Sequence, residues 1–321
     1  MTDQPRPVPL KHAGRLPRED IFGIADMRFS NDGRYLFCVG HSPRIELWSV
    51  FKGDEEEGLL LKHFECRARV LRSVTVRSDS ARFACAADRS VLLFDVARGV
   101  MVRKMGTPTY AQRQQNPNFK YTGHEGQVNC VAFGGIDEKN ALLASAGADG
   151  RALFWDTRNA ERPVQVVGQD NRGALTEVRF VGRSAFATAS ADGFVRVYDL
   201  RKTTETLHEF TDAVQALSFS QNAQLMLTSV QGAGACLCDV APHRNEQLRL
   251  FPLARVTQCA FFNEENHIVC GSTSGELLCF DALHRYDQLH KRRVSSSSPQ
   301  AHAESFSVAA SPVTTLAVHP Q

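Results

Sequence analysis

Three side chains in the segment from residue 123 to residue 158 are of the types that perform nucleophilic catalysis. His124, Ser145 and Asp149 supply a base, a hydroxyl and a carboxylate. In serine hydrolases the carboxylate orients the imidazole, which takes the proton of the hydroxyl. The same segment ends in Trp155-Asp156, and a buried indole N–H needs a hydrogen-bond acceptor. The spacing therefore permits two interpretations, a catalytic triad or a structural hydrogen-bond network.

The surrounding sequence favours the structural interpretation, because this segment is one copy of a repeat. Six apolar runs each end in a residue that is followed by Asp or, in the first run, by Ser. These residues are Trp48, Phe94, Trp155, Tyr198, Cys238 and Phe280. The intervals are 46, 61, 43, 40 and 42 residues, close to the ~40–45 residues of a propeller blade. Unpaired buried polar groups cost about 1–3 kcal/mol each. The polar groups of a buried His-Ser-Asp-Trp set are therefore expected to form hydrogen bonds with one another.

A second pattern recurs in step with the first. Apolar residues alternate with other residues in seven short runs, which is typical of half-buried strands. We expect strands at 24–29, 71–76, 128–133, 175–180, 214–219, 256–261 and 313–318. Many short strands at regular spacing predict an all-β fold with essentially no helix.

The two patterns together resemble WD40-repeat proteins over residues 20–321, with "GHEGQVNCVAF" (123–133) and "DGFVRVYDLR" (192–201) as the clearest stretches. The resemblance implies a seven-bladed β-propeller, of which this chain supplies six full blades and the first strand of a seventh. It also implies that His124, Ser145, Asp149 and Trp155 form the structural tetrad of a blade. Thr188, Asp192 and Tyr198 would be a partial tetrad in the next one.

The organisation expected from this resemblance is one propeller, residues 20–321, preceded by a segment of residues 1–19 that pairs with the last blade. Residues 106–121 read as an insertion loop, and residues 290–312 as a basic, Ser-rich loop. Ser295 and Ser298 in that loop match basic-directed and proline-directed phosphorylation sites. We expect that the C-terminus is truncated.

The composition excludes several classes of function. The net charge of +2 gives no general argument for binding nucleic acid or an anionic membrane, and no apolar run approaches the ~20 residues of a spanning helix. The nine cysteines lack the clustered spacing of a zinc site. Phosphate-binding and hydrolase motifs are absent from the sequence. We therefore expect no catalytic residues, no metal, no cofactor and no small-molecule substrate.

A non-catalytic propeller binds its partners through the loops around its channel. The residues flanking the starts of the inner strands are expected to form this top face: Arg72, Arg89, Gln127, Asn129, Thr176, Gln215, Arg255 and Thr257. Arginine is suited to carboxylates and phosphates, so we expect acidic or phosphorylated protein partners.

More narrowly, the chain is similar to the mitogen-activated protein kinase organizer family, through "VLLFDVARGVMVRK" (91–104), "GHEGQVNCVAF" (123–133), "RPVQ" (162–165) and "DGFVRVYDLR" (192–201). That resemblance implies a scaffold, cytoplasmic or also nuclear, which assembles components of a kinase cascade or of splicing complexes. Direct RNA binding ranks last, because no aromatic residues are interleaved among the arginines.

A second hypothesis rests on two consecutive boxes of the form W/Y-D-x-R, with Asp156 and Arg158 in the first and Asp199 and Arg201 in the second. They resemble the motif by which propeller substrate receptors bind the DDB1 adaptor of cullin-4 ubiquitin ligases. The competing interpretation is that each arginine pairs locally with the aspartate of its own blade.

Overall fold

The computed structural model describes thirteen segments and two single residues of the chain. They are residues 23–49, 59–106, 123–134, 142–158, 162–168, 173–182, 185–199, 205–240, 247–251, 256–262, 267–273, 276–281, 304–307, 316 and 318. Every regular element among them is a β-strand, and the strands form six four-stranded antiparallel sheets. The all-β propeller prediction is confirmed.

The first three sheets follow one another along the chain, and each is a simple meander. The first contains β1 (Ile24–Phe29), β2 (Tyr35–Gly40), β3 (Arg44–Ser49) and β4 (Leu59–Glu65). The second contains β5 (Leu71–Val76), β6 (Arg82–Ala87), β7 (Ser90–Asp95) and β8 (Val100–Met105). The third contains β9 (Val128–Phe133), β10 (Leu142–Gly147), β11 (Ala152–Asp156) and β12 (Gln165–Val167).

The remaining three sheets repeat this arrangement. The fourth contains β13 (Leu175–Val181), β14 (Ala185–Ser190), β15 (Phe194–Asp199) and β16 (Glu205–Glu209). The fifth contains β17 (Val214–Phe219), β18 (Leu225–Val230), β19 (Gly234–Asp239) and β20 (Gln247–Phe251). The sixth contains β21 (Val256–Phe262), β22 (His267–Ser272), β23 (Glu276–Asp281) and β24 (Glu304–Ser307).

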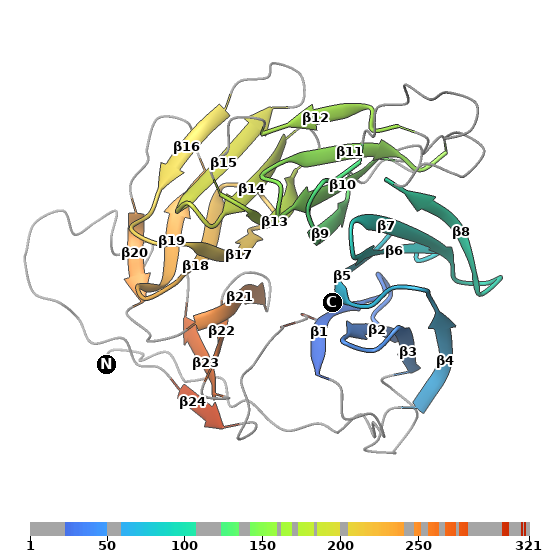
Figure 1. The fold of residues 1–321 in the computed structure, drawn as a ribbon. Coiled ribbons are helices and arrows are strands. Elements are labelled where there is room, and N and C mark those ends of the chain that lie inside the picture. Colours follow the sequence, from blue (N-terminus) through green and yellow to red (C-terminus); the bar gives the residue numbers. More distant parts are fainter. Residues whose placement is uncertain are drawn as a thin grey trace, which may run out of the picture.

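The sheets are arranged around a common centre, with the first strand of each sheet innermost and the fourth outermost (Figure 1). Consecutive inner strands contact each other from β1 through β5, β9, β13 and β17 to β21. All six begin at the residue that the alternating pattern predicts. The seventh run, residues 313–318, lies outside the described residues except for Leu316 and Val318, which are not in a strand.

The expected loop at 290–312 is corrected by the structure, because it contains the strand β24. The backbone of β24 pairs with β23, with Leu277 opposite Phe306 and Glu276 opposite Ser307. Without this partner β23 would present a row of unpaired backbone groups at the edge of the sheet. The Ser-rich stretch therefore precedes the outer strand of the sixth sheet, and it is not a connector to a seventh. The segment 1–19, and the insertion at 106–121 apart from Gly106, lie outside the described residues.

Each junction between consecutive sheets has its own apolar core. Phe37 and Phe64 of the first sheet pack against Phe83 and Phe94 of the second, with ring centroids 4.9 to 5.8 Å apart. Phe154 of the third sheet packs edge-on against Phe186 of the fourth, with the centroids 4.6 Å apart. Burial of these rings provides most of the stabilisation between blades.

The cysteines belong to these cores, as the sequence predicts. All nine are free thiols, and only Cys66 is not fully buried. Burial raises the pKa of Cys238 and of Cys270 to about 12, so these thiols stay protonated at neutral pH. Protonated, buried thiols act as small apolar side chains.

Candidate functional site

The four candidate tetrad residues form one chain of hydrogen bonds in the third sheet. Nδ1 of His124 lies 3.0 Å from Oδ1 of Asp149, and Nε2 lies 2.8 Å from Oγ of Ser145. The indole N–H of Trp155 donates to the same Oγ at 2.9 Å. His124 and Trp155 are each 1% exposed, and Ser145 is fully buried. The serine hydroxyl is therefore enclosed and bonded to two side chains of its own blade.

The backbone is shaped to let these groups meet. A Cβ placed on Gly147, the last residue of β10, would lie 2.3 Å from Nδ1 of His124 and 2.4 Å from Oδ1 of Asp149. No other residue fits this position without displacing the pair. The turn that follows contains Gly150 with a φ of 75°, a left-handed conformation that favours glycine. The Ala-Asp-Gly turn thus positions the carboxylate against the imidazole.

The carboxylate of Asp149 is held as an anion. Burial alone would raise its pKa, but the hydrogen bond and charge of His124 lower it, as do the backbone N–H groups of Glu125 and Arg151. The net result is a pKa well below the usual range of an aspartate. The folded state therefore binds the proton of this carboxyl less readily than the unfolded state does.

This difference predicts acid sensitivity that depends on Asp149. Above the pKa of an unfolded aspartate, about 3.9, the ionised carboxylate stabilises the fold in full. As the pH falls below that value the unfolded state gains a proton first, so stability decreases. The Asp149→Asn variant should start less stable at pH 7 and lose less between pH 5 and pH 2. Urea unfolding followed by tryptophan fluorescence at each pH measures this; parallel pH profiles of the two proteins would contradict it.

Two other sheets have different residues at these positions, and in one of them a buried indole N–H is again hydrogen-bonded. In the first sheet the indole N–H of Trp48 donates to Oε2 of Glu46 at 3.0 Å, and Glu46 lies opposite Cys38. In the fourth sheet a guanidinium nitrogen of Arg196 lies 3.6 Å from Asp192. Glu46 and Arg196 occupy the position that Leu153 holds opposite Ser145 in the third sheet.

The partial tetrad of the fourth sheet is incompletely bonded. Thr188 is 1% exposed, and its hydroxyl has no hydrogen-bond partner in the structure. Asp192 accepts the backbone N–H of Phe194 in the turn. The ring of Tyr198 stacks on Phe186 with the centroids 4.8 Å apart. These three residues are thus close to one another without forming the continuous chain that the third sheet has.

A β-bulge at the start of every inner strand shapes the face of the ring on which the tetrad turn lies, which we call the tetrad face. In each of the six sheets the second residue of the inner strand is skipped in the pairing register. Bulges re-aim a side chain relative to the regular pleat. The six bulge residues are Ala25, Arg72, Asn129, Thr176, Gln215 and Thr257.

The bulge residues differ in whether their side chains are already hydrogen-bonded within the ring. Asn129 donates to the carbonyl of Leu175 at 2.8 Å, and Thr176 donates to that of Val214 at 2.7 Å. Both side chains therefore link consecutive inner strands. Thr257 donates to the carbonyl of Gly271 within its own sheet.

The exposed members of the predicted top face are Arg72, Arg89 and Gln215. Arg72 donates to Oε1 of Gln127 at 2.8 Å across the second and third sheets. Arg255 lies outside the described residues.

Arginines gather on the second sheet's part of the tetrad face. Arg67 and Arg69, just before β5, are exposed together with Arg72 and Arg89. The acidic residue among them is Asp88, whose carboxylate accepts the backbone N–H of Arg69 at 3.3 Å. We call these four arginines the arginine corner.

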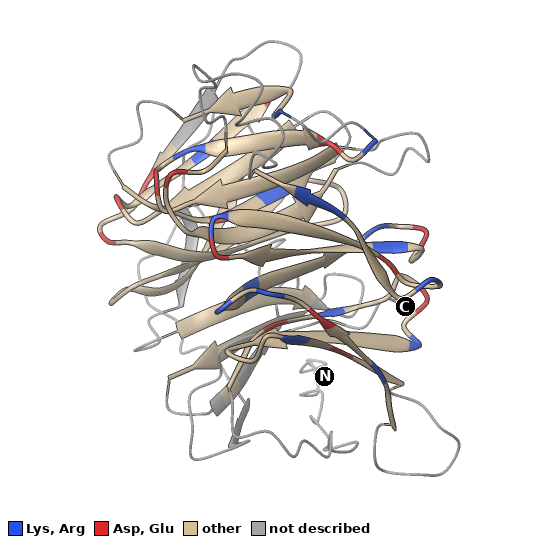
Figure 2. Cartoon of the chain, turned by 45° about the vertical axis from the view of Figure 1, so that its right-hand side comes forward, with Lys and Arg blue, Asp and Glu red and all other residues tan. Residues whose placement is uncertain are grey.

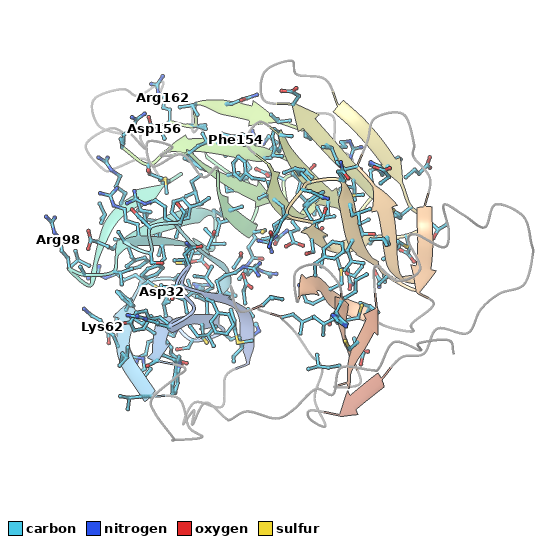
Figure 3. The ribbon with its side chains drawn as sticks, turned by 180° about the vertical axis from the view of Figure 1, so that it is seen from behind. Asp32, Lys62, Arg98, Phe154, Asp156 and Arg162 are labelled. Carbon is cyan, nitrogen blue, oxygen red and sulfur yellow. The ribbon has the colours of Figure 1, made fainter. Side chains whose placement is uncertain are left out.

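The remaining predicted residues fall at the rim or outside the described residues. Arg158 binds Asp156 through two nitrogens, at 3.0 and 2.8 Å, while its own side chain is 71% exposed. This is the local pairing that competes with the adaptor interpretation, and Figure 3 shows Asp156 at the outer edge of the ring. Asp199 closes β15, whereas Arg201, Ser295 and Ser298 are not described.

The sequence analysis missed two buried acids near the channel. Asp26 of β1 accepts the backbone N–H of Val74 on β5 at 3.0 Å, and Glu177 of β13 accepts that of Leu217 on β17. Each acid is the third residue of its inner strand and pairs with an arginine two residues later. The available signal was a charged residue at the third position of an inner strand, where the other four sheets have the uncharged residues Ser73, Cys130, Ala216 and Gln258.

Within the described part of the chain no group of three or more His, Cys, Asp or Glu side chains could hold a metal ion. The same residues include no helix long and apolar enough to cross a membrane.

The sequence of this chain is similar to a protein family and to several known proteins. The family model described as WD domain, G-beta repeat, matches residues 115–156, which include the whole tetrad. The chain is similar to the WD repeat domain-containing protein 83 homolog of Dictyostelium discoideum, at 20% identity over 81% of this chain and 82% of that protein. It is also similar to the SIR4-interacting protein SIF2 of Saccharomyces cerevisiae, at 24% identity over 63% of this chain.

A further relative is the DDB1- and CUL4-associated factor 10 of Xenopus laevis, at 23% identity over 49% of this chain. The chain spans only 36% of the length of the yeast relative and 37% of that of the Xenopus relative.

Proposed function

We propose that this chain, which resembles WD40-repeat proteins in its fold and in residues 115–156, is a non-catalytic scaffold that binds acidic or phosphorylated segments of other proteins on its tetrad face. The observation that supports this most directly is the arginine corner. Its four arginines are exposed, and Asp88 beside them accepts the backbone N–H of Arg69. Arginine binds carboxylates and phosphates through two parallel N–H groups.

The bulges explain why a rigid ring can present such groups. A side chain on a regular inner strand points into the channel or into the neighbouring sheet, whereas the bulge turns Arg72 towards solvent. Gln127 holds one end of this guanidinium, which reduces the conformational entropy lost when a ligand binds. A rigid platform with a prepositioned cation suits a scaffold better than a flexible loop does.

The partners that we propose are components of a mitogen-activated protein kinase cascade or of a splicing ribonucleoprotein, in the cytoplasm or the nucleus. The support is the resemblance of residues 91–104 and 123–133 to the kinase organizer family. A scaffold acts by raising the effective concentration of partners held on one body. The phosphorylation of Ser295 and Ser298 remains a prediction.

Affinity purification with quantitative mass spectrometry tests the tetrad face. The Arg72→Glu/Arg89→Glu variant should lose its specific partners about tenfold or more, because each reversed charge repels an acidic segment. Arg34→Glu is a matched control, since Arg34 is 77% exposed in the turn between β1 and β2, at the other end of the strands. An unchanged partner set in the double variant would show that this face is not the binding surface.

The second candidate function is that of a substrate receptor of a cullin-4 ubiquitin ligase. The relative named as a DDB1- and CUL4-associated factor favours it, although Arg158 is engaged by Asp156. The same purification decides this with an Arg158→Ala/Arg201→Ala variant. Adaptor present with wild type and lost from this variant supports the receptor function; absence of adaptor from both samples excludes it.

A further inference from the structure

We propose that the outer wall of the first and second sheets is a second docking surface, separate from the tetrad face, for a partner segment that combines apolar with acidic side chains. The surface consists of parts of β4 and β8, the outermost strands of these two sheets. Figure 2 turns this side of the ring towards the viewer. The proposal does not depend on the arginine corner, which lies on another face.

Both strands expose apolar side chains. We define the outer apolar patch as Leu59, Leu61, Val100, Met101 and Val102, which are 39% to 51% exposed. Single exposed apolar residues are normal on a protein surface. β8 exposes three consecutive apolar residues and β4 exposes two, and exposed apolar residues gathered in this way are typical of a protein-interaction site.

Lys62 of β4 reaches the second sheet at Gly99, the residue before β8. Its side chain leaves β4 and lies against Gly99, where an added Cβ would overlap the end of the lysine chain. The absence of a side chain at Gly99, whose φ is 70°, makes room for the charged end of Lys62 at the junction of the two sheets. Nζ then lies 5.4 Å from the ring centre of Phe64, within range of a cation–π interaction.

The backbone of these strands indicates how a partner binds. Both strands have a β-bulge, at Leu61 in β4 and at Val102 in β8, where the register shifts against the inner neighbour. Bulges twist an edge away from the flat geometry that a further strand needs. Side-chain contacts, and not extension of the sheet, therefore hold the partner.

The charges around the patch indicate the chemistry of the partner. Lys62, Arg98, Arg103 and Lys104 surround the apolar residues, and none of them forms an ion pair with a described residue. Figure 3 shows Lys62 and Arg98 on the same outer side of the ring. The acidic residues of β4 and of the β7–β8 hairpin are Glu65 and Asp95. A cationic rim favours an acidic ligand and suppresses basic ones.

A phage-displayed library of random 12-residue peptides, selected on the full chain, tests the proposal. We expect recovered peptides that combine Asp or Glu with apolar residues. Their affinity should fall by about tenfold or more, equivalent to the loss of one good contact, in Leu61→Ser/Met101→Ser and separately in Arg103→Glu/Lys104→Glu. Val164→Ser is the matched control, because Val164 is 61% exposed outside the patch.

The remaining outcomes contradict the proposal. Peptides without an acidic and apolar composition, or with equal affinity for both patch variants and wild type, would show that the wall is not a docking surface. The same conclusion follows if acidic peptides bind only after residues 54–57, Asp-Glu-Glu-Glu, are neutralised, since the chain's own acidic run would then be the occupant. Retained binding by Arg72→Glu/Arg89→Glu separates this surface from the tetrad face.

Discussion

Replacing Glu177 by Gln should lower the free energy of unfolding by about 2–4 kcal/mol. Glu177 is 5% exposed, accepts the backbone N–H of Leu217 on the next sheet, and pairs with Arg179. Glutamine keeps an acceptor for the N–H but removes the charge that balances a partly buried guanidinium, since the side chain of Arg179 is 22% exposed. Urea unfolding followed through the fluorescence of Trp48 and Trp155, which are both buried, measures the change.

The same sheet supplies the control for this prediction. Glu209 lies on the outer strand β16 and is exposed, so Glu209→Gln should change stability by less than about 0.5 kcal/mol. A Glu177→Gln/Arg179→Leu double variant should recover most of the loss, because it leaves no unpaired charge and keeps an acceptor for the N–H of Leu217. A loss below about 1 kcal/mol in Glu177→Gln, or no recovery in the double variant, would contradict this role.

The electrostatics of the channel support so large an effect. Burial would lower the pKa of Arg179, but the nearby Glu177, Cys130 and Asp26 raise it above its ordinary value. Asp26 belongs to the first sheet and Glu177 to the fourth, so acids from two separated sheets act on one guanidinium. The two buried acids thus join neighbouring inner strands by hydrogen bonds. Both also raise the pKa of Arg179.

The strands were predictable from sequence because their signal is local. Alternation of apolar residues over six positions defines each inner strand, and its start at Val128 or Val214 follows from the pattern alone. The tetrad was predictable for a similar reason, since its four residues lie within 32 consecutive positions of one repeat, from His124 to Trp155.

The bulges and the substituted bonds were not predictable in the same way. A bulge depends on how two strands pair, and the sequence around Arg72 or Thr176 does not specify which residue the register skips. Glu46 bonds to Trp48 two residues along β3, and Arg196 pairs with Asp192 four residues before it. Both contacts are local in sequence, but the alternation of apolar residues does not show which polar side chains bond to each other.

The third and fourth sheets provide a direct comparison of a bonded and an unbonded hydroxyl at the same position. Ser145 and Thr188 are both the fourth residue of their second strand, and both are buried. Ser145 bonds to Trp155 and His124, whereas the hydroxyl of Thr188 has no partner. Removing a hydroxyl should therefore have opposite consequences in the two sheets.

Ser145→Ala should cost about 2–4 kcal/mol, because the indole N–H of Trp155 and Nε2 of His124 both lose their partner in the core. Thr188→Val should leave stability unchanged or raise it by up to about 1 kcal/mol, since it replaces an unbonded hydroxyl with a methyl group of similar size. Urea midpoints of the two variants and the wild type measure both changes. Equal losses in the two variants would mean that the hydroxyl of Ser145 stabilises the fold through packing and not through its hydrogen bonds. The tetrad would then not stabilise the blade.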